Sequence, residues 1–462
     1  MKAENTAVSG SFRDPSGFLF WHEKRLFRQV NRGYREHYDL LIASQLYEKL
    51  VSAGKLIAHE ECDAQLARTP DAYKVIRPDL VPFISYPFEW CFSQLKDAAL
   101  LTLDIQRTAL EHGMSLKDAS AYNVQFVHGR PLLIDTLSFE KYPAGRPWVA
   151  YRQFCQHFLA PLALMAHRDV RLNQMSRLFL DGIPLDLASS LLPARTRWRF
   201  SLLSHIHMHA RSQQRYADKP VPGKTRPMSR FALLALLNSL ETAVKKLSWR
   251  PRGSEWAEYY ENTNYSDQAR DLKKMLVADF LQQLNPGHVC DIGANTGVFS
   301  RLAAERGIPT VALDIDAAAV EKNYLQVRRD CEKFMLPLVG DITNPSPGIG
   351  WENNERLPLL QRFPVDMVLA LALVHHLAIA NNLPLAKIAD FFRASCRSLV
   401  IEFIPKSDSQ VRRLLATRED IFPGYSVVGF EKEFQEHFTI ERREAIAGTE
   451  RILYLMRSRG PK

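Results

Sequence analysis

A glycine-containing turn between a short apolar strand and a helix is the segment of this sequence best suited to chemistry. Residues 289–300 read V-C-D-I-G-A-N-T-G-V-F-S. Glycine at 293 and 297 lets the backbone turn sharply and lie against a ligand without an intervening Cβ. The helix that follows presents free backbone N–H groups and a partial positive charge at its N-terminus. The turn therefore predicts a site for a nucleotide or nucleoside with an anionic group.

The residues of the turn exclude two common nucleotide sites. A dinucleotide fingerprint that starts at Gly293 needs glycine where this chain has Asn295 and Val298, and no Gly-Lys-Ser/Thr of a phosphate-binding loop follows. The spacing G-x-N-x-G after an acid instead resembles motif I of class I S-adenosylmethionine-dependent methyltransferases. Asparagine tolerates left-handed backbone angles well, so its place in the motif is a mild departure. The resemblance implies S-adenosylmethionine as the cofactor, bound by Asp291, Gly293, Asn295 and Gly297.

Two later acids occupy positions that fit the same ligand. Asp314 ends the second expected strand, 23 residues after Asp291, where a carboxylate can accept hydrogen bonds from ribose hydroxyls. Asp316 would take this role if the strand ended later. Asp341 follows the third expected strand, and the resemblance implies that it contacts the adenine amino group.

Two adjacent histidines supply a candidate base for methyl transfer. The fourth expected strand ends A-L-A-L-V-H-H-L, which places His375 and His376 at the carboxyl edge of the sheet, where open α/β sheets bind ligands. Imidazole titrates near neutral pH and can accept a hydroxyl proton. The alternative is that one histidine packs against the next helix and the other lines the cofactor site. The chain lacks the Asn/Asp-Pro-Pro-Tyr/Phe tetrapeptide of enzymes that methylate planar amino nitrogens, which favours an oxygen acceptor. The first hypothesis is methylation of a hydroxyl or carboxyl of a small molecule or glycan.

Further contacts with the cofactor or the acceptor are expected before the turn and at the fifth strand. The resemblance places the segment 258–273 over the methionine end of the cofactor. The candidate residues of this segment and of the fifth strand are Tyr260, Asn264, Tyr265, Lys273 and Glu402. An amphipathic lead-in helix, and a salt-bridged structural acid at 402, are the alternatives.

A second pattern lies in the N-terminal part of the chain. Asp118 and Asn123 form D-x-x-x-x-N, and Asp135 ends an apolar strand, which resembles the catalytic loop and metal-binding aspartate of kinase-like folds. The sequence departs from the usual kinase pattern in three ways. Leu-Lys replaces the usual His-Arg or His-Gly before the loop aspartate, and Thr-Leu replaces the usual Phe-Gly after the second aspartate. No clear glycine-rich phosphate loop comes before them. Arg28 or Lys74 would have to replace the nucleotide-binding lysine. A degenerate kinase-like module that binds a substrate or partner, an active kinase, and an unrelated α+β domain with a capped turn all stay open.

The elements that must hold the methyltransferase-like site alternate as a parallel sheet covered by helices requires. The helices are expected at 269–284, 299–306, 317–330 and 385–396. The strands are expected at 288–292, 309–313, 336–339, 365–373, 398–403, 439–443 and 451–456. The predicted fold class is α/β, a Rossmann-like class I methyltransferase sheet, preceded by an α+β domain.

Changes in composition and in the predicted secondary structure divide the chain into three parts. Residues 15–212 form the N-terminal α+β domain, and 213–255 hold a linker rich in Pro, Gly and charge followed by a lead-in helix at 231–247. Residues 256–462 form the methyltransferase domain.

Composition limits the partners and the compartment. The 462 residues carry a net charge of +9 that is spread along the chain, so a nucleic-acid partner is less favoured than solvated basic helix faces. The six cysteines form no C-x-x-C pair, which indicates no zinc site and fits a reducing compartment. No signal peptide and no membrane span are expected, and we predict a cytoplasmic protein. The oligomeric state cannot be predicted.

Over its whole length, including P-F-I-S-Y-P-F-E-W at 82–90 and L-K-D-A-S-A-Y-N-V-Q-F at 116–126, the chain resembles a bacterial group of methyltransferases labelled nodulation-protein-like. This resemblance implies a glycan or signalling molecule as the acceptor. An RNA or protein methyltransferase and a bifunctional or pseudo-kinase scaffold are the other functions considered.

Overall fold

The computed structural model describes residues 6–209, 227–251, 266–362, 365–416 and 418–460. The chain divides into two compact units. The first holds Met1–Arg250 together with Gly348–Arg356, and the second holds Pro251–Pro347 and Leu357–Lys462. Among the residues described, no helix is long and apolar enough to cross a membrane.

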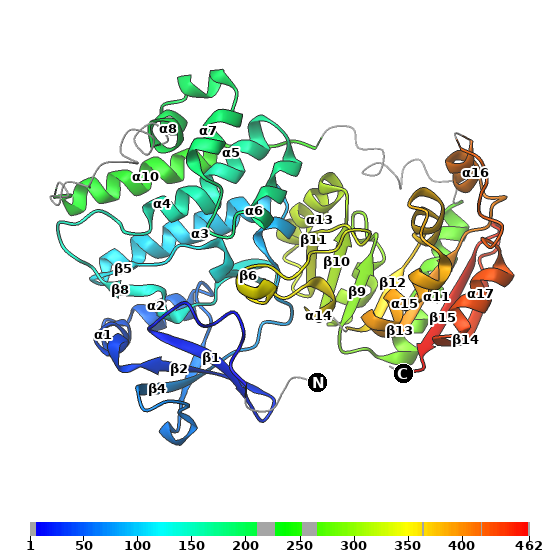
Figure 1. Ribbon diagram of the computed structural model, residues 1–462, viewed down its shortest axis with the longest axis horizontal. Coiled ribbons are helices and arrows are strands. Elements are labelled where there is room, and N and C mark those ends of the chain that lie inside the picture. The colour runs from blue at the N-terminus through cyan, green and yellow to red at the C-terminus, as the bar shows by residue number, and fades with distance from the viewer. Residues whose placement is uncertain (1–5, 210–226, 252–265, 363–364, 417, 461–462) are drawn as a thin grey trace. The chain divides into compact units, whose positions relative to one another are not determined.

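The second unit is built on a seven-stranded sheet in the order β11-β10-β9-β12-β13-β15-β14 (Figure 1). All neighbouring pairs are parallel except those that involve β15, which runs antiparallel to both β13 and β14. The strands are β9 (Val289–Ile292), β10 (Thr310–Asp314), β11 (Met335–Val339), β12 (Val365–Ala370), β13 (Cys396–Phe403), β14 (Phe438–Ala445) and β15 (Ile452–Ser458). This strand order confirms the predicted Rossmann-like class I methyltransferase fold.

The sheet topology fixes where a ligand can bind. From the central β9 the chain moves outward through β10 to β11 and then returns to β12 on the other side of β9. Adjacent loops diverge above the strands at such a switch point and leave a crevice at the carboxyl ends of the strands.

The helices of the second unit connect these strands. Ser266 caps the first of them by accepting a hydrogen bond from the Ala269 N–H, and left-handed Asn285 ends it. Its apolar face, with Val277 and Phe280, packs on sheet residues that include Met367. The helices are α11 (Asp267–Leu284), α12 (Ser300–Ala304), α13 (Ala317–Asp330), α14 (Leu359–Arg362), α15 (Leu385–Ser395), α16 (Ser409–Leu415) and α17 (Val427–Gln435). Of these, α14, α16 and α17 were not predicted from the sequence.

The first unit begins with an antiparallel sheet in the order β1-β2-β4-β3. Its strands are β1 (Gly17–His22), β2 (Arg25–Asn31), β3 (His59–Cys62) and β4 (Ala72–Pro78), with α1 (Arg35–Ala43) and α2 (Leu46–Ser52) between β2 and β3. A long helix, α3 (Phe92–Glu111), then leads into two small antiparallel pairs, β5 with β8 and β6 with β7. These are β5 (Met114–Leu116), β6 (Val124–Val127), β7 (Arg130–Leu133) and β8 (Phe139–Lys141).

Helices complete the first unit. They are α4 (Tyr151–Phe154), α5 (Ala160–His167), α6 (Met175–Leu178), α7 (Leu185–Leu191), α8 (Phe200–Leu202) and α10 (Arg230–Lys246). The expected lead-in helix is α10, and it packs on α3 within this unit rather than introducing the last domain. Arg107 of α3 donates a 2.7 Å hydrogen bond to Glu241 of α10, which ties the two helices together.

A short segment from late in the sequence, Gly348–Arg356, also belongs to the first unit. Glu355 of this segment is almost fully buried and forms an ion pair with Arg13, with an Nη2–Oε2 distance of 3.0 Å. The Arg356 guanidinium lies 4.7 Å from the centre of the Tyr122 ring. The predicted boundaries at 212 and 256 therefore miss this insertion, because nothing in its composition distinguishes it from an ordinary loop.

Candidate functional site

The turn after β9 has the backbone geometry that its residues predict. Gly293, Asn295 and Gly297 have φ of +76°, +52° and +81°. The expectation that Asn295 adopts a left-handed conformation is confirmed. A Cβ on Gly293 would meet no atom closer than Leu373 at 3.4 Å, so the backbone here is open to a ligand. A Cβ on Gly297 would lie 2.6 Å from Asn323 Nδ2, so this glycine serves the close approach of the turn to α13.

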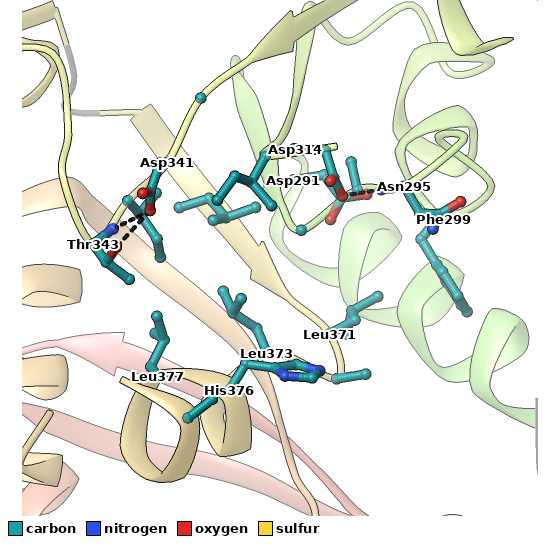
Figure 2. Close-up of a pocket in the computed structure, with 18 of the residues that line it drawn as sticks. Asp291, Asn295, Phe299, Asp314, Asp341, Thr343, Leu371, Leu373, His376 and Leu377 are labelled. Carbon is teal, nitrogen blue, oxygen red and sulfur yellow. Dashed lines mark hydrogen bonds between the residues drawn. The ribbon is translucent and has the colours of Figure 1, made fainter. Parts of the chain in front are cut away.

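A cavity of about 320 Å³ lies where the carboxyl ends of β9, β10, β11 and β12 meet. Figure 2 shows the acids and Asn295 on one side of it, with His376 and three leucines on the other. Of the predicted site residues, the structure places Lys273, Asp291, Gly293, Asn295, Asp314, Asp341 and His376 in its lining. Gly297, His375 and Glu402 are not among the described lining residues.

Asp314 is held rigidly at the edge of the cavity. Its carboxylate accepts backbone hydrogen bonds from Asn295 at 2.7 Å and Asp316 at 2.8 Å. Burial raises its pKa to about 6 because the charged form loses solvation. Asp316, the fallback candidate, accepts instead from the Ala318 N–H and caps α13. Asp314 is therefore the acid of this strand that a ligand would meet.

Asp291 fixes the turn to the following helix. Its carboxylate accepts a 2.6 Å hydrogen bond from the Ser300 hydroxyl at the start of α12. Burial raises the pKa of Asp291 to about 6, while the Ser300 bond and the Lys273 charge oppose that rise. The carboxylate therefore shapes the turn as well as lining the cavity.

Asp341 stands at the opposite end of the acid-lined wall. It accepts hydrogen bonds from the Thr343 N–H at 2.8 Å and from the Thr343 hydroxyl at 2.7 Å. The local turn that results orients the carboxylate after β11. Thr343 itself lines the cavity and was not predicted.

Lys273, in the lining of the cavity, forms a buried ion pair with Glu402. Lys273 Nζ lies 2.6 Å from Glu402 Oε2, with 4% of the lysine side chain exposed and none of the glutamate. Nζ also lies 4.7 Å from the centre of the Phe299 ring. Burial lowers the pKa of Lys273, and the Glu402 charge opposes that shift. Glu402 thus has the salt-bridged role that the sequence analysis kept as its alternative.

Arg451 extends this pair and was missed from the sequence. Its side chain is 2% exposed, approaches Glu402 Oε1 at 3.7 Å, and donates to Asp408 at 2.8 Å. The feature that could have identified Arg451 from the sequence is its place directly before the apolar run of β15. A buried charge in such a place needs partners.

The two histidines differ in their surroundings. His376 is half-buried and lines the cavity, whereas His375 is only 2% exposed. Burial lowers the pKa of His375 well below its ordinary value, with His376 and Arg451 acting in the same direction. Among described residues, His375 Nδ1 has no hydrogen-bond partner. His376 is the histidine that an acceptor in this cavity would reach.

Three candidates of the lead-in segment, Tyr260, Asn264 and Tyr265, lie outside the described residues. The sequence analysis did not select the other side chains that complete the cavity. They include Arg270, Phe299, Leu371, Leu373 and Leu377.

The structure brings the three kinase-like candidates of the first unit together. Asn123 lies close enough to Asp118 to lower the pKa of that carboxyl, although burial outweighs this effect and raises it. Asn123 donates to Ser138 Oγ at 3.3 Å, and that hydroxyl donates to Asp135 at 2.7 Å. Arg28 forms an ion pair with Asp135. Burial works to raise the pKa of Asp135, but the Arg28 charge and the Ser138 bond outweigh it and leave the pKa lowered.

The second candidate for a nucleotide-binding cation is placed differently. Lys74 pairs with Glu61 at 2.6 Å on the exposed side of the small sheet. No group of three or more His, Cys, Asp or Glu side chains is arranged to hold a metal ion within the part of the chain that the structure describes.

Solved structures with similar folds include known methyltransferases. The bifunctional kinase-methyltransferase WbdD is 14% identical, with a TM-score of 0.31, and the match covers 47% of this chain and 45% of that one. The magnesium protoporphyrin IX methyltransferase ChlM from Synechocystis PCC 6803 with bound SAH is 19% identical, with a TM-score of 0.31, and the match covers 44% of this chain and 93% of that one. The N-methyltransferase NodS from Bradyrhizobium japonicum WM9 is 13% identical, with a TM-score of 0.30, and the match covers 42% of this chain and 98% of that one. The chain thus spans less than half the length of WbdD. At these values the likenesses add nothing to the fold that the strand order already establishes.

Sequence similarity to a curated protein is far stronger. No protein-family model matches the chain. The nodulation protein NoeA from Rhizobium meliloti (strain 1021) is 35% identical over 455 residues, which cover 97% of this chain and 95% of that protein. Similarity of this extent confirms the resemblance noted from the sequence, and the chain belongs to the family of nodulation protein NoeA.

Proposed function

We propose that the second unit binds S-adenosylmethionine and methylates a hydroxyl oxygen of a small-molecule or glycan acceptor. The observation that carries the proposal is the joint presence of Asp314, Asp341 and the left-handed turn at Asn295 in one cavity at the switch point of the sheet. Ligands of open α/β sheets bind at this position.

The residues of the cavity fit this cofactor. A carboxylate has about four acceptor sites, and backbone bonds from Asn295, Ile315 and Asp316 leave Asp314 able to accept from a ribose hydroxyl. The open backbone at Gly293 admits the methionine portion, and Asp341 lies where an adenine amino group would donate.

The proposed chemistry follows from positioning. S-adenosylmethionine, when bound, supplies a methyl carbon that its sulfonium activates for in-line displacement. Leu371, Leu373 and Leu377 exclude water on the far side of the cavity. His376, which lies on the same side of the cavity as these leucines, can accept the proton that the acceptor hydroxyl loses as its oxygen attacks.

Replacing His376 by alanine is expected to slow methyl transfer roughly 100-fold or more, the usual contribution of a general base. The measurement is transfer of a tritiated methyl group from S-adenosylmethionine to an extract of a deletion strain. Calorimetry on the same variant should show cofactor affinity within about threefold of the parent, because no cofactor bond is assigned to the imidazole. Transfer at the parental rate would remove His376 from the mechanism.

The acceptor class is tested in the same assay. The name of the relative NoeA, a nodulation protein, supports a glycan or signalling molecule as the acceptor. Label that survives both ribonuclease and protease treatment would agree with this proposal. Label lost to one of these treatments would favour the RNA or the protein acceptor instead.

Cofactor affinity is expected to fall at acidic pH. Ribose hydroxyls bind the ionised form of Asp314, whose pKa burial raises to about 6. Protonation at lower pH therefore competes with the ligand, and affinity at pH 5.5 should be about 4-fold weaker than at pH 7.5. Calorimetry at both pH values measures this difference. In Asp314→Asn the change in affinity between the two pH values should be smaller than in the parent. The part that remains would come from Asp291, whose pKa is also raised to about 6. A change in affinity as large as that of the parent would contradict the assignment.

For the first unit we propose a degenerate kinase-like module that lacks metal-dependent nucleotide chemistry. The specific observation is that the Arg28 guanidinium, paired with Asp135, supplies the positive charge that a magnesium ion would otherwise bring. Titration of the full chain with a fluorescent ATP analogue should show no saturable binding that magnesium increases. Magnesium-dependent binding that Asp135→Asn abolishes would instead support an active phosphotransfer site.

A further inference from the structure

A short segment of the first unit carries an unusual run of exposed aromatic and basic side chains. Residues 194–200 read A-R-T-R-W-R-F and span a 3-10 turn, Ala194–Trp198, and the start of α8. Trp198 is 91% exposed and Phe200 79% exposed. The arginines at 195, 197 and 199 are exposed as well. We call Arg195, Arg197, Trp198, Arg199 and Phe200 the arginine–tryptophan edge.

A buried anchor presents this edge to solvent. Thr196 is fully buried, and its hydroxyl lies 3.0 Å from His207 Nε2 and donates to the Pro193 carbonyl at 2.6 Å. His207 Nδ1 in turn lies 2.8 Å from the Ser189 hydroxyl. Because the threonine is held inward, the residues on either side of it face outward. The exposure of the edge is therefore a property of the packed turn rather than of a frayed end.

The arginines of the edge have no acidic residues near them in the sequence. No aspartate or glutamate occurs between Leu187 and His209. None of the three arginines makes an ion pair among the residues that the structure describes. Burial lowers the pKa of His167, and the charges of Arg199 and Arg195 act in the same direction.

An open groove of about 590 Å³ continues from the aromatic pair toward α10. Trp198, Phe200 and Leu202 line one side, and Ala243 and Lys246 of α10, with Leu247 directly after it, contribute to the other. Apolar surface therefore lies directly beside positive charge, and both face solvent. Tryptophan and arginine in this combination are typical of the boundary between lipid headgroups and acyl chains.

We propose that the arginine–tryptophan edge binds the surface of an anionic lipid membrane. Trp198 and Phe200 would enter the headgroup region, and the three arginines would lie against lipid phosphates. A single-stranded RNA is the other polyanion with an affinity for aromatics. It is less favoured because RNA binding normally uses a basic groove that follows several phosphates, whereas here the three arginines lie within five residues, next to Trp198 and Phe200.

The test is flotation of the full-length chain with vesicles of phosphatidylcholine alone or mixed with phosphatidylglycerol. We expect binding to the mixed vesicles only, weakened by added salt. The triple variant Arg195→Gln, Arg197→Gln, Arg199→Gln should lose roughly 100-fold in vesicle affinity. The double variant Trp198→Ala, Phe200→Ala should lose roughly 10-fold or more.

Leu178→Ala is the matched control, because Leu178 is 78% exposed in the same unit but lies outside the edge. Its affinity should equal that of the parent, and circular dichroism should show that all variants are folded. All substituted side chains are exposed, so folding should be kept. The proposal is overturned if the parent does not bind anionic vesicles, or if both edge variants bind them with the affinity of the parent. It is also overturned if the edge binds single-stranded RNA but no vesicles.

Discussion

Replacing Asp314 by alanine is expected to weaken S-adenosylmethionine binding roughly 10- to 100-fold, because a charge-assisted hydrogen bond of about 1.5–3 kcal/mol to the ribose is lost. The change also removes the acceptor that holds the Asn295 and Asp316 N–H groups in place. The cost should therefore exceed that of a ligand contact alone. Isothermal titration calorimetry with the purified full chain measures the effect.

The matched control is Asp316→Asn. Asp316 lies two residues away and caps α13, and asparagine is an equally good N-cap residue. This variant should bind the cofactor like the parent. Binding that is unchanged in Asp314→Ala, or lost equally in both variants, would show that the ligand is not held as proposed.

Breaking the buried ion pair is the change with the largest expected effect on stability. In Glu402→Leu the Lys273 ammonium stays buried, with 4% of its side chain exposed, and loses its carboxylate. Removing one partner of a buried pair costs about 3–5 kcal/mol. We expect a clear fall in the thermal midpoint of the full chain. Differential scanning calorimetry measures this change.

A second substitution tests whether the uncompensated charge is the cause. Lys273→Met added to Glu402→Leu removes that charge and should restore most of the lost stability. Recovery should be incomplete, because Arg451 also approaches Glu402, at 3.7 Å. A double variant no more stable than Glu402→Leu would show that Glu402 acts through shape and not through charge.

The parallel part of the fold was predictable because its signals are local. Buried strands such as β12 are short apolar runs, and α13 begins and ends at the residues expected for it. The position of β15 between β13 and β14 was not predictable, because strand order depends on pairing between distant segments. The same holds for α10, whose amphipathic pattern gives no information on which unit it packs against.

The candidate site was predictable where backbone conformation determines residue type. Gly293 and Asn295 line the cavity as expected, since positive φ limits the choice of residue. Gly297 has the same conformation but faces α13, a difference that the motif cannot reveal. His375 and His376 likewise differ in burial and in access to the cavity, which their adjacent places in the sequence do not reveal. Arg451 was missed because its partners are 43 and 49 residues distant in sequence.

The most direct test of the central proposal is photo-cross-linking of methyl-tritiated S-adenosylmethionine to the full chain, followed by peptide mapping. The proposed site predicts a single labelled region among peptides that contain 270–273, 291–299, 314–315, 340–343 or 371–381, the segments that line the cavity. Excess unlabelled cofactor should abolish the label, and Asp314→Ala should prevent it. Absence of specific label, or label confined to peptides of the first unit, would contradict the assignment of this cavity as the cofactor site.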